Sequence, residues 1–323
     1  MKICRQLAAA ALALSIALVG EAAACRPKPA STSEDAAAQA AAESKIEYGS
    51  FQSGALGHEL KFAVQLPPSY ERDDKRRFPV LYFLHGMFGS EREFERRGVA
   101  AAVNKMREEG KIGEFLIVAV DGGRSSFYLN AKNGVRYEDA IVKDLIPYIE
   151  KTYRTIGAPA GRAIQGISMG GFGALVIAFK YPEMFSSVST HCAALFAELP
   201  TPAGTDQYSD FRRKLIGNIF GEPPDDAFFR ANNPMHLAAA NSAQIKKAGI
   251  KIYADVGEQD RYGFADSNKD FDDRLNKAGI AHEFHVYPGN HGWEYMLTVA
   301  DHSYAFLWNN FRSGKTSVAS RAN

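Results

Sequence analysis

The stretch Ala163-Ile164-Gln165-Gly166-Ile167-Ser168-Met169-Gly170-Gly171-Phe172-Gly173 decides the fold of this chain. Its first part, 163–167, has the composition of a short buried β-strand, and an apolar, helix-compatible run, 173–181, follows the glycines. Between them lies Gly-x-Ser-x-Gly, the pattern of a tight turn that presents a serine hydroxyl beyond the edge of a sheet. The glycines remove Cβ atoms that would clash where strand and helix pass closely. A chance match is the alternative, but strand, turn and helix together predict that Ser168 is a nucleophile.

Length and charge set broad limits on what the chain can be. Its 323 residues suit one large α/β domain or two small ones. The formal net charge is +1, which gives no sign of a nucleic-acid or anionic-membrane partner. We therefore expect no nucleic-acid binding.

The first 24 residues have the features of a secretory signal peptide. Lys2 and Arg5 are positively charged, residues 7–19 form an apolar run too short to span a membrane comfortably, and residues 22–24 are alanines suited to cleavage. An ordinary N-terminal helix is the alternative. The pattern predicts export to the periplasm or the cell envelope.

Cys25 directly follows the three alanines and leaves a second interpretation open. Lipoprotein processing would make it the lipidated first residue and a membrane tether, although Ala22 stands where such signals usually carry leucine or a similar residue. Residues 25–44 are rich in Ala, Ser and Pro and lack aromatic residues, so we expect a disordered tether. Cys192 is the one cysteine in the folded body, which leaves no disulfide there. We expect it to be a buried small residue at a strand end rather than a nucleophile.

Strands and helices alternate through the folded body, residues 45–312. The first two β-like runs, 46–51 and 60–66, predict an antiparallel hairpin at a sheet edge. Further runs predict mainly buried parallel strands, at 79–84, 115–120, 163–167, 186–190, 251–256 and 282–287. Helical patterns occur at 91–109, at 137–153 with a kink at Pro147, at 264–278 and at 294–311. We predict an α/β fold with a doubly wound, mostly parallel sheet, and a disordered tail at 313–323.

Residues suited to catalysis follow several of the predicted strands. Ligands bind at the carboxyl ends of strands in such sheets, and Met87, Ser168, Asp260 and His291 all lie at such ends. A serine hydroxyl needs a neighbouring base, and the base needs an orienting acid. The chain order Ser168, Asp260, His291 is the order found in α/β-hydrolases. We predict Ser168 as nucleophile, His291 as general base and Asp260 as orienting acid.

Other residues are candidates for the same roles. His191 is the alternative base, and Asp255 and Glu258 are alternative acids. Asp255 lies inside a predicted strand and Glu258 only one step into the next turn, whereas Asp260 ends that turn. A helix cap or an Asx turn is the structural alternative for Asp260. His85 is expected to bond the backbone of its loop rather than to act in catalysis.

From about Ile46 to Phe311 the chain resembles the esterase D-type branch of the α/β-hydrolases. That branch includes S-formylglutathione hydrolases, enterochelin and feruloyl esterases, and antigen 85 mycolyltransferases. The motifs are specific as an ordered set, whereas singly only the serine motif and the His291 loop are. They are Leu84-His85-Gly86, Asp121-Gly122-Gly123 with Ser125-Ser126-Phe127-Tyr128, Asp144-Leu145-Ile146-Pro147, Gly166-Ile167-Ser168-Met169-Gly170-Gly171, Gly257-Glu258-Gln259-Asp260 and Gly289-Asn290-His291-Gly292-Trp293.

The resemblance implies an α/β-hydrolase fold and a serine esterase that acts on a small-molecule ester. Ser168, Asp260 and His291 match the catalytic triad of the family, and the backbone amides of Met87 and Met169 match its oxyanion hole. We expect no cofactor and no metal, because scattered histidines and carboxylates lack ligand spacing. The residues expected to contact substrate are His85, Phe88, Tyr128 and Trp293.

Two departures from relatives narrow the expected activity. Antigen 85 enzymes carry Asp and Arg around the oxyanion loop to hold a sugar acceptor, whereas this chain has His85 and Phe88 there, which argues against mycolyl transfer. S-formylglutathione hydrolases are cytoplasmic, and an export signal argues against that substrate. Hydrolysis of a carboxylic ester outside the cytoplasm remains. An acyltransferase using the same acyl-enzyme, or a non-catalytic surface binding module on the same fold, are the alternatives.

Residues 195–248 interrupt the alternation with prolines and short helical patches, as an insertion over the strand ends. The segment lacks the long amphipathic helix of a lipase lid, so we expect a modest pocket for small or aromatic acyl esters. Its aromatic residues either roof that pocket or only anchor the insertion. They are Phe196, Tyr208, Phe211, Phe220, Phe228 and Phe229.

Overall fold

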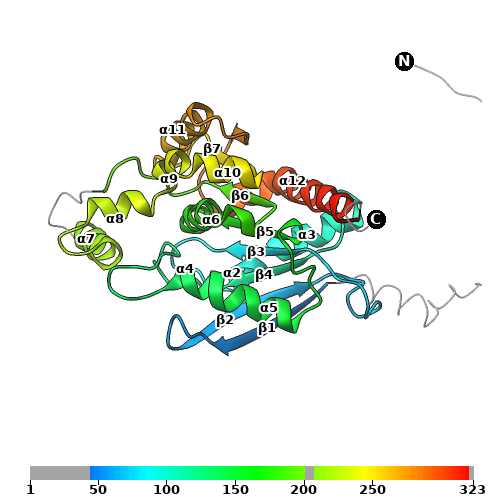
Figure 1. Cartoon of the computed structure of the whole chain (residues 1–323). Coiled ribbons are helices and arrows are strands. Elements are labelled where there is room, and N and C mark those ends of the chain that lie inside the picture. The colour runs from blue at the N-terminus through cyan, green and yellow to red at the C-terminus, as the bar shows by residue number, and fades with distance from the viewer. Residues whose placement is uncertain (1–43, 201–206, 320–323) are drawn as a thin grey trace, which may run out of the picture. The chain divides into compact units, whose positions relative to one another are not determined.

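The structure is a computed structural model that describes residues 44–200 and 207–319 (Figure 1). The predicted signal peptide, the lipidation site at Cys25 and the tether up to residue 43 lie outside the described residues. Within the described residues, no helix combines the length and the apolar character needed to cross a membrane.

Eight strands form one sheet in the order β1-β2-β4-β3-β5-β6-β7-β8. The edge strands β1 (Lys45–Gln52) and β2 (Glu59–Leu66) pair antiparallel, as predicted, and β2 pairs antiparallel with β4. The remaining neighbours are parallel. These strands are β3 (Val80–Leu84), β4 (Leu116–Val120), β5 (Arg162–Ile167), β6 (Ser187–His191), β7 (Lys251–Gly257) and β8 (Glu283–Tyr287). The predicted α/β class with a mostly parallel sheet is confirmed.

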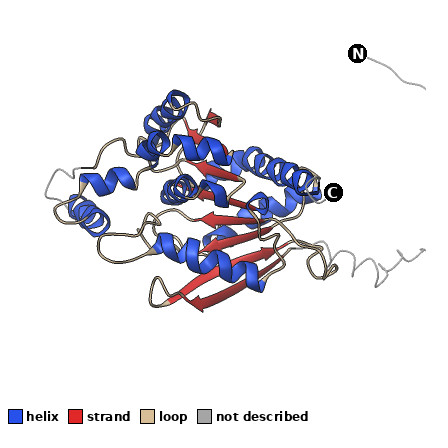
Figure 2. Cartoon of the chain, viewed as in Figure 1, coloured by secondary structure: helices blue, strands red, loops and turns tan. Residues whose placement is uncertain are grey.

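Helices cover both faces of the sheet (Figure 2). Alternate residues of β3 face opposite sides, so Tyr82 packs in one apolar cluster and Phe83 in the other. The first cluster includes residues of α5, α6, α9 and α11, and the second includes residues of α3 and α12. The helices are α2 (Glu93–Arg96), α3 (Val99–Glu108), α4 (Tyr137–Asp139), α5 (Ile146–Thr152), α6 (Met169–Lys180), α7 (Gln207–Phe220), α8 (Asp226–Ala231), α9 (Pro234–Ala240), α10 (Ser242–Ala248), α11 (Phe264–Lys277) and α12 (Trp293–Ala319). Shorter helical segments are η1 (Ala140–Leu145), η2 (Pro159–Gly161) and η3 (Pro182–Met184).

Several predicted helix boundaries are corrected by the structure. The helix predicted at 91–109 is two helices, α2 and α3, because Gly98 takes a left-handed conformation with φ of 82° between them. Instead of the kink predicted at Pro147, the structure has a π-helical segment, η1, just before this residue. Proline has no backbone N–H and cannot donate the usual helical hydrogen bond. The helix after Ser168 starts at Met169 rather than at residue 173. The disordered tail predicted from residue 313 is helical as far as Ala319, because α12 continues.

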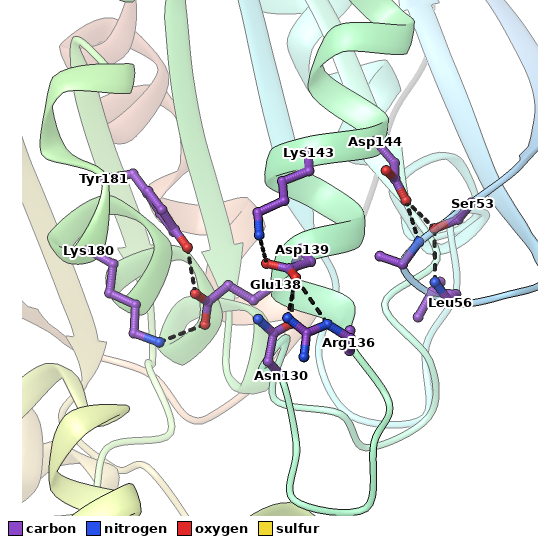
Figure 3. A network of polar contacts seen from close by, with 11 residues as sticks. Ser53, Leu56, Asn130, Arg136, Glu138, Asp139, Lys143, Asp144, Lys180 and Tyr181 are labelled. Carbon is purple, nitrogen blue, oxygen red and sulfur yellow. Dashed lines mark hydrogen bonds and ion pairs between the residues drawn. The ribbon is translucent and has the colours of Figure 1, made fainter.

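Polar contacts tie the segment α4–η1 to its neighbours on both sides (Figure 3). The Asp144 carboxylate accepts hydrogen bonds from Ser53 Oγ at 2.6 Å and from the Ala55 N–H at 2.9 Å, in the turn between β1 and β2. On the other side, Glu138 binds Lys180 Nζ at 2.7 Å, at the end of α6. The segment thus joins the edge hairpin to the helix that begins beside Ser168.

The insertion between β6 and β7 consists of α7 to α10, in agreement with the predicted short helical patches. Phe220 and Phe229 are buried in the same apolar cluster as residues of α5 and α6, so these two aromatics anchor the insertion to the body. Phe211 on α7 is exposed and lies 5.7 Å from the ring of Phe88, in the loop after β3. The α7 end of the insertion therefore reaches the carboxyl edge of the sheet.

Candidate active site

Ser168 occupies the sharp turn between β5 and α6. Its backbone has φ of 56° and ψ of −118°, a conformation that residues other than glycine rarely adopt and that persists only when the surroundings hold it. The Ser168 N–H donates to the carbonyl of His191 at 2.9 Å, and its own carbonyl accepts from Ala194 N–H at 3.0 Å and from Phe172 N–H at 3.1 Å. The chain therefore holds this serine in a strained, fully specified position.

The motif glycines are required by close backbone contacts. A Cβ atom on Gly166 would lie 2.1 Å from the carbonyl oxygen of Gly170, and one on Gly170 would lie 2.0 Å from that of Leu84. Both distances are far below van der Waals contact. Strand β5, helix α6 and the end of β3 thus lie so close together that only glycine fits at these two positions.

Asp260 and His291 come together at the ends of β7 and β8. Nδ1 of His291 lies 2.7 Å from Oδ2 of Asp260, and the Tyr262 N–H donates to Oδ1 at 2.9 Å. Burial opposes ionisation of this carboxyl, but the hydrogen bond and charge of His291 together with backbone N–H groups outweigh it and lower the pKa of Asp260. An Nδ1–H that donates to this carboxylate leaves Nε2 as a proton acceptor. Among the hydrogen bonds of the described residues, none joins His291 to Ser168.

The alternative base and one alternative acid form a second pair. His191 Nδ1 lies 3.0 Å from Asp255 Oδ1, and both residues are fully buried. Asp255 also accepts a hydrogen bond from the Tyr295 hydroxyl at 3.0 Å, and Gln165 Nε2 lies 3.3 Å from His191 Nε2. Since neither side chain reaches solvent, this pair cannot meet a substrate, and Ser168 contacts His191 only through its backbone. The sequence analysis considered the two residues separately and did not predict that they pair. The signal that could have revealed the pair is the register of β6 and β7, which places His191 opposite Asp255.

The loop after β3 passes directly over Ser168. A Cβ atom on Gly86 would lie 3.5 Å from Ser168 Cβ, which places the next amide, that of Met87, beside the serine. Phe88 has φ of 64°, and its N–H donates to the carbonyl of Arg124 at 2.7 Å. Met169 begins α6, where backbone N–H groups lack helical partners. Both amides predicted for the oxyanion hole therefore belong to segments adjoining Ser168.

The residues predicted to contact substrate divide into supports and surface groups. His85 is buried; its Nδ1 lies 2.7 Å from the Gly86 carbonyl, and Gly122 N–H donates to its Nε2 at 2.9 Å. Tyr128 is fully buried and donates to the His85 carbonyl at 3.0 Å. The predictions that His85 and Tyr128 contact substrate are therefore wrong. Both side chains are buried, where they support the loop after β3 through hydrogen bonds and cannot touch a substrate. His85 thus bonds its loop backbone, as its structural interpretation predicted.

Trp293 packs against the apolar core, whereas Phe88 is exposed to solvent. Trp293 begins α12 and packs on Phe83, with ring centroids 6.0 Å apart, in the apolar cluster behind the sheet. Phe88 is 53% exposed beside the serine loop. Of the four residues predicted as substrate contacts, Phe88 is therefore best placed to meet a ligand.

Cys192 lies beneath the Asp260–His291 pair. It is fully buried directly after β6, as predicted, and burial raises the pKa of its thiol. Cys192, Asp260 and His291 each offer a ligand atom, and these atoms lie within 4.8 Å of one another. Because the carboxylate and the imidazole already bind each other and the thiol stays protonated, this set fits a resident metal ion poorly.

Two hollows open near this edge of the sheet. An apolar cavity of about 60 Å³ lies beneath the insertion, and a polar hollow of about 290 Å³ lies on the β4 side. The apolar cavity is lined by Phe127, Phe172, Phe196, Leu215, Ile216 and Phe220, among others. Phe196 contacts Phe264, with ring centroids 5.7 Å apart, and Phe264 lies 5.6 Å from the ring of His291. Aromatic contacts thus link the wall of the apolar cavity to the histidine.

A serine on a strained turn after a parallel strand, with an Asp–His pair at later strand ends, defines the α/β-hydrolase class. Within this class the chain belongs to the esterase family whose model is described as "Putative esterase", which matches residues 53–298.

Relatives with sequence or structural similarity are named as esterases or as hydrolases. An esterase of Mycobacterium tuberculosis is 31% identical over 265 residues, which cover 76% of this chain and 56% of that protein, so the chain spans just over half the length of that relative. An S-formylglutathione hydrolase of Arabidopsis thaliana is 26% identical over 77% of this chain and 88% of its own. A ferulic acid esterase structure superposes with a TM-score of 0.70 at 27% identity, covering 83% of this chain and 99% of that chain.

Proposed function

We propose that this protein hydrolyses carboxylic esters through an acyl-enzyme on Ser168. The observation that carries the proposal is the 2.7 Å contact between His291 and Asp260, at the same sheet edge as a serine held in a strained turn. Membership of the esterase family supports the same chemistry.

In the proposed mechanism, His291 Nε2 takes the proton of Ser168 Oγ while this oxygen attacks the ester carbonyl carbon. The amides of Met87 and Met169 stabilise the oxyanion that forms. The imidazolium then gives its proton to the departing alcohol oxygen, which leaves an acyl group on Ser168. Water, deprotonated by His291, releases the acid by the same steps in reverse. Asp260 holds the imidazole tautomer with Nε2 facing the serine.

A fluorophosphonate probe with matched serine variants tests the proposal. We expect covalent labelling and ester turnover in the wild type, and loss of both in Ser168→Ala with the circular dichroism spectrum unchanged. Ser242→Ala, on α10 and away from the turn, should label as the wild type does. Labelling that persists in Ser168→Ala would overturn the assignment, and absence of labelling in the folded wild type would favour a binding module.

We propose small or aromatic acyl esters as substrates, because apolar side chains surround the cavity beneath the insertion. A panel of acetyl, feruloyl and long-chain esters with a common alcohol would test this choice. Short and aromatic acyl groups should be turned over fastest. Adding alcohol or sugar acceptors and analysing products separates hydrolysis from acyl transfer, since transfer would convert the acceptor into a new ester.

A further inference from the structure

We propose that the polar hollow beside Arg124 binds an acid group carried by the ester substrate, at the end remote from the scissile carbonyl. The inference rests on the proposed esterase function and names a class of substrate for it. Three observations support it: the hollow lies close to Ser168, its wall contains several polar side chains, and the Arg124 side chain is available to bind an anion.

The hollow lies between the loop after β4 and helix α7. Its volume is about 290 Å³, and about half of the residues in its wall carry polar side chains. They are His58, Arg124, Ser125, Ser126, Asn133, Tyr137 and Asn218. Lys132 N–H donates to the Ile219 carbonyl at 2.9 Å, so backbone bonds join the loop and α7 across the hollow. A concave site with several convergent polar groups is the usual form of a ligand site.

The hollow is close to the proposed reaction centre. Strand β3 alone separates β4 from β5, so the ends of β4 and β5 are about 10 Å apart at ordinary strand spacing. The Arg124 carbonyl accepts the Phe88 N–H at 2.7 Å, and Phe88 directly follows Met87 in the loop over Ser168. An ester of moderate length can therefore place its carbonyl at Ser168 and its far end at Arg124.

Arg124 is available to an anion. Its guanidinium lies 5.2 Å from the centre of the exposed Phe88 ring, and in the described part of the chain no hydrogen bond or ion pair engages this side chain. The acid of the same loop, Asp121, is already occupied: its Oδ1 accepts the Gly123 N–H at 2.9 Å. A planar guanidinium is suited to bidentate binding of a carboxylate.

The neighbouring groups favour an acid over a purely neutral ligand. Burial opposes ionisation of Asp121, but the neighbouring His85, the hydrogen bond from the Gly123 N–H and the charge of Lys61 lower its pKa. Arg124 lines the hollow, and among the described residues that form its wall none is an aspartate or a glutamate. The serine hydroxyls and asparagine amides can complete the hydrogen bonds of a bound carboxylate. Two substrate forms fit, one with the acid on the acyl chain and one with it on the alcohol.

Paired substrates and arginine variants test this proposal. One pair has a common alcohol and acyl chains of equal length ending in methyl or in carboxylate. The other pair has a common acyl group and alcohols with or without a carboxylate. Replacing Arg124 by Gln should lower kcat/KM for at least one acidic ester about ten- to a hundredfold, the effect of losing a charge-assisted bidentate contact. The matched neutral ester should change less than twofold, and Arg124→Lys should recover part of the loss.

Arg261→Gln is the control, because Arg261 also faces an aromatic ring, that of Tyr262 at 5.3 Å, but lies beside Asp260 on the opposite side of Ser168. This variant should change the acidic and neutral members of each pair equally. The pair that responds to Arg124→Gln shows which half of the substrate enters the hollow. Equal effects of Arg124→Gln on acidic and neutral esters in both pairs would overturn the inference while leaving the esterase function intact. Failure of the function itself would appear as turnover by Ser168→Ala.

Discussion

Asp255 lies within the last residues of strand β7 and Asp260 in the loop that follows it; each binds a histidine, but their environments differ. Asp260 pairs with the histidine of the β8 loop, whereas Asp255 pairs with a histidine in the interior. We expect Asp260→Asn to lower kcat by up to about ten-thousandfold, because the wrong imidazole tautomer results. Asp255→Asn should instead lower the free energy of unfolding by about 3 kcal/mol or more, since a buried partner is lost.

Steady-state kinetics and urea unfolding of both variants distinguish these roles. The assignment predicts a large kcat loss with near-native stability for Asp260→Asn. A large kcat loss at unchanged stability for Asp255→Asn, with Asp260→Asn active, would make Asp255 the functional acid.

Glu114 provides a pH-dependent contribution to stability. Burial opposes its ionisation, but Ser69 Oγ at 2.5 Å, Ser69 N–H at 2.9 Å and the Arg76 guanidinium lower the pKa of Glu114 below its ordinary value. A carboxyl whose pKa is lower in the folded state stabilises the fold above its unfolded pKa, and the contribution disappears as pH falls through the folded pKa.

The stability gap between wild type and Glu114→Gln should therefore be present at pH 7 and shrink below about pH 4, the ordinary range of a glutamate. Urea unfolding across this pH series measures it. Glu108→Gln is the control, because Glu108 is exposed and its side chain has no ion pair in the described ranges. A gap for Glu114→Gln that widens on acidification would contradict the sign of the pKa shift.

At the scale of elements, helix α6 packs against the end of β3 so closely that no side chain fits at Gly170. Gly170→Ala would place a Cβ atom 2.0 Å from the Leu84 carbonyl oxygen, and backbone on both sides prevents easy relief. We expect a loss of about 3 kcal/mol or more in the free energy of unfolding. Gly54→Ala, where no atom lies within 4 Å of the added Cβ, should change stability by less than about 0.5 kcal/mol. Chemical denaturation of the two variants measures the difference, and equal stabilities would show that α6 can shift.

The Asp144 carboxylate connects the helical layer to the edge hairpin. Asp144→Ala leaves Ser53 Oγ and the Ala55 N–H without their acceptor, at a cost of about 1–3 kcal/mol. Asp144→Asn retains one acceptor oxygen and should lose less. Hydrogen exchange should show the loosening in the turn between β1 and β2, next to His58. Loosening spread evenly through the sheet would argue against this local role.

At the scale of elements, the sequence predicted strands well and helix interruptions poorly. Continuous apolar runs placed β3 and β4 within one residue of their observed starts, because both faces of these strands are buried. The break at Gly98 and the π-helical turn before Pro147 depend on local backbone conformation, which an apolar period does not record. The Asp260–His291 contact followed from chain order, whereas the buried state of Tyr128 and the His191–Asp255 pair depend on packing between distant segments.

In the whole molecule, the insertion is bound to the body at several points. Lys132 Nζ lies 2.7 Å from Asp225 at the start of α8, and Asn241 Nδ2, at the end of α9, donates to the Phe179 carbonyl of α6 at 2.9 Å. Lys180 of α6 also reaches Asn232 at 2.5 Å. Ionic and amide contacts, together with buried aromatics, therefore hold α8 and α9 against the hydrolase body rather than leaving them as a free flap.

Because the insertion is anchored, we expect the reaction rate not to depend on whether the ester is dissolved or emulsified. A lipase lid exposes an apolar surface when it opens at an interface, but the buried faces of α8 and α9 already serve as part of the core. Rates on dissolved short-chain esters should follow simple saturation, with no increase when the ester concentration passes its solubility limit. Initial rates measured across that limit, and on emulsified long-chain triglyceride at equal enzyme concentration, provide the check. A sharp rise on the emulsion would show that the insertion opens as a lid, because only newly exposed apolar surface could then account for the gain.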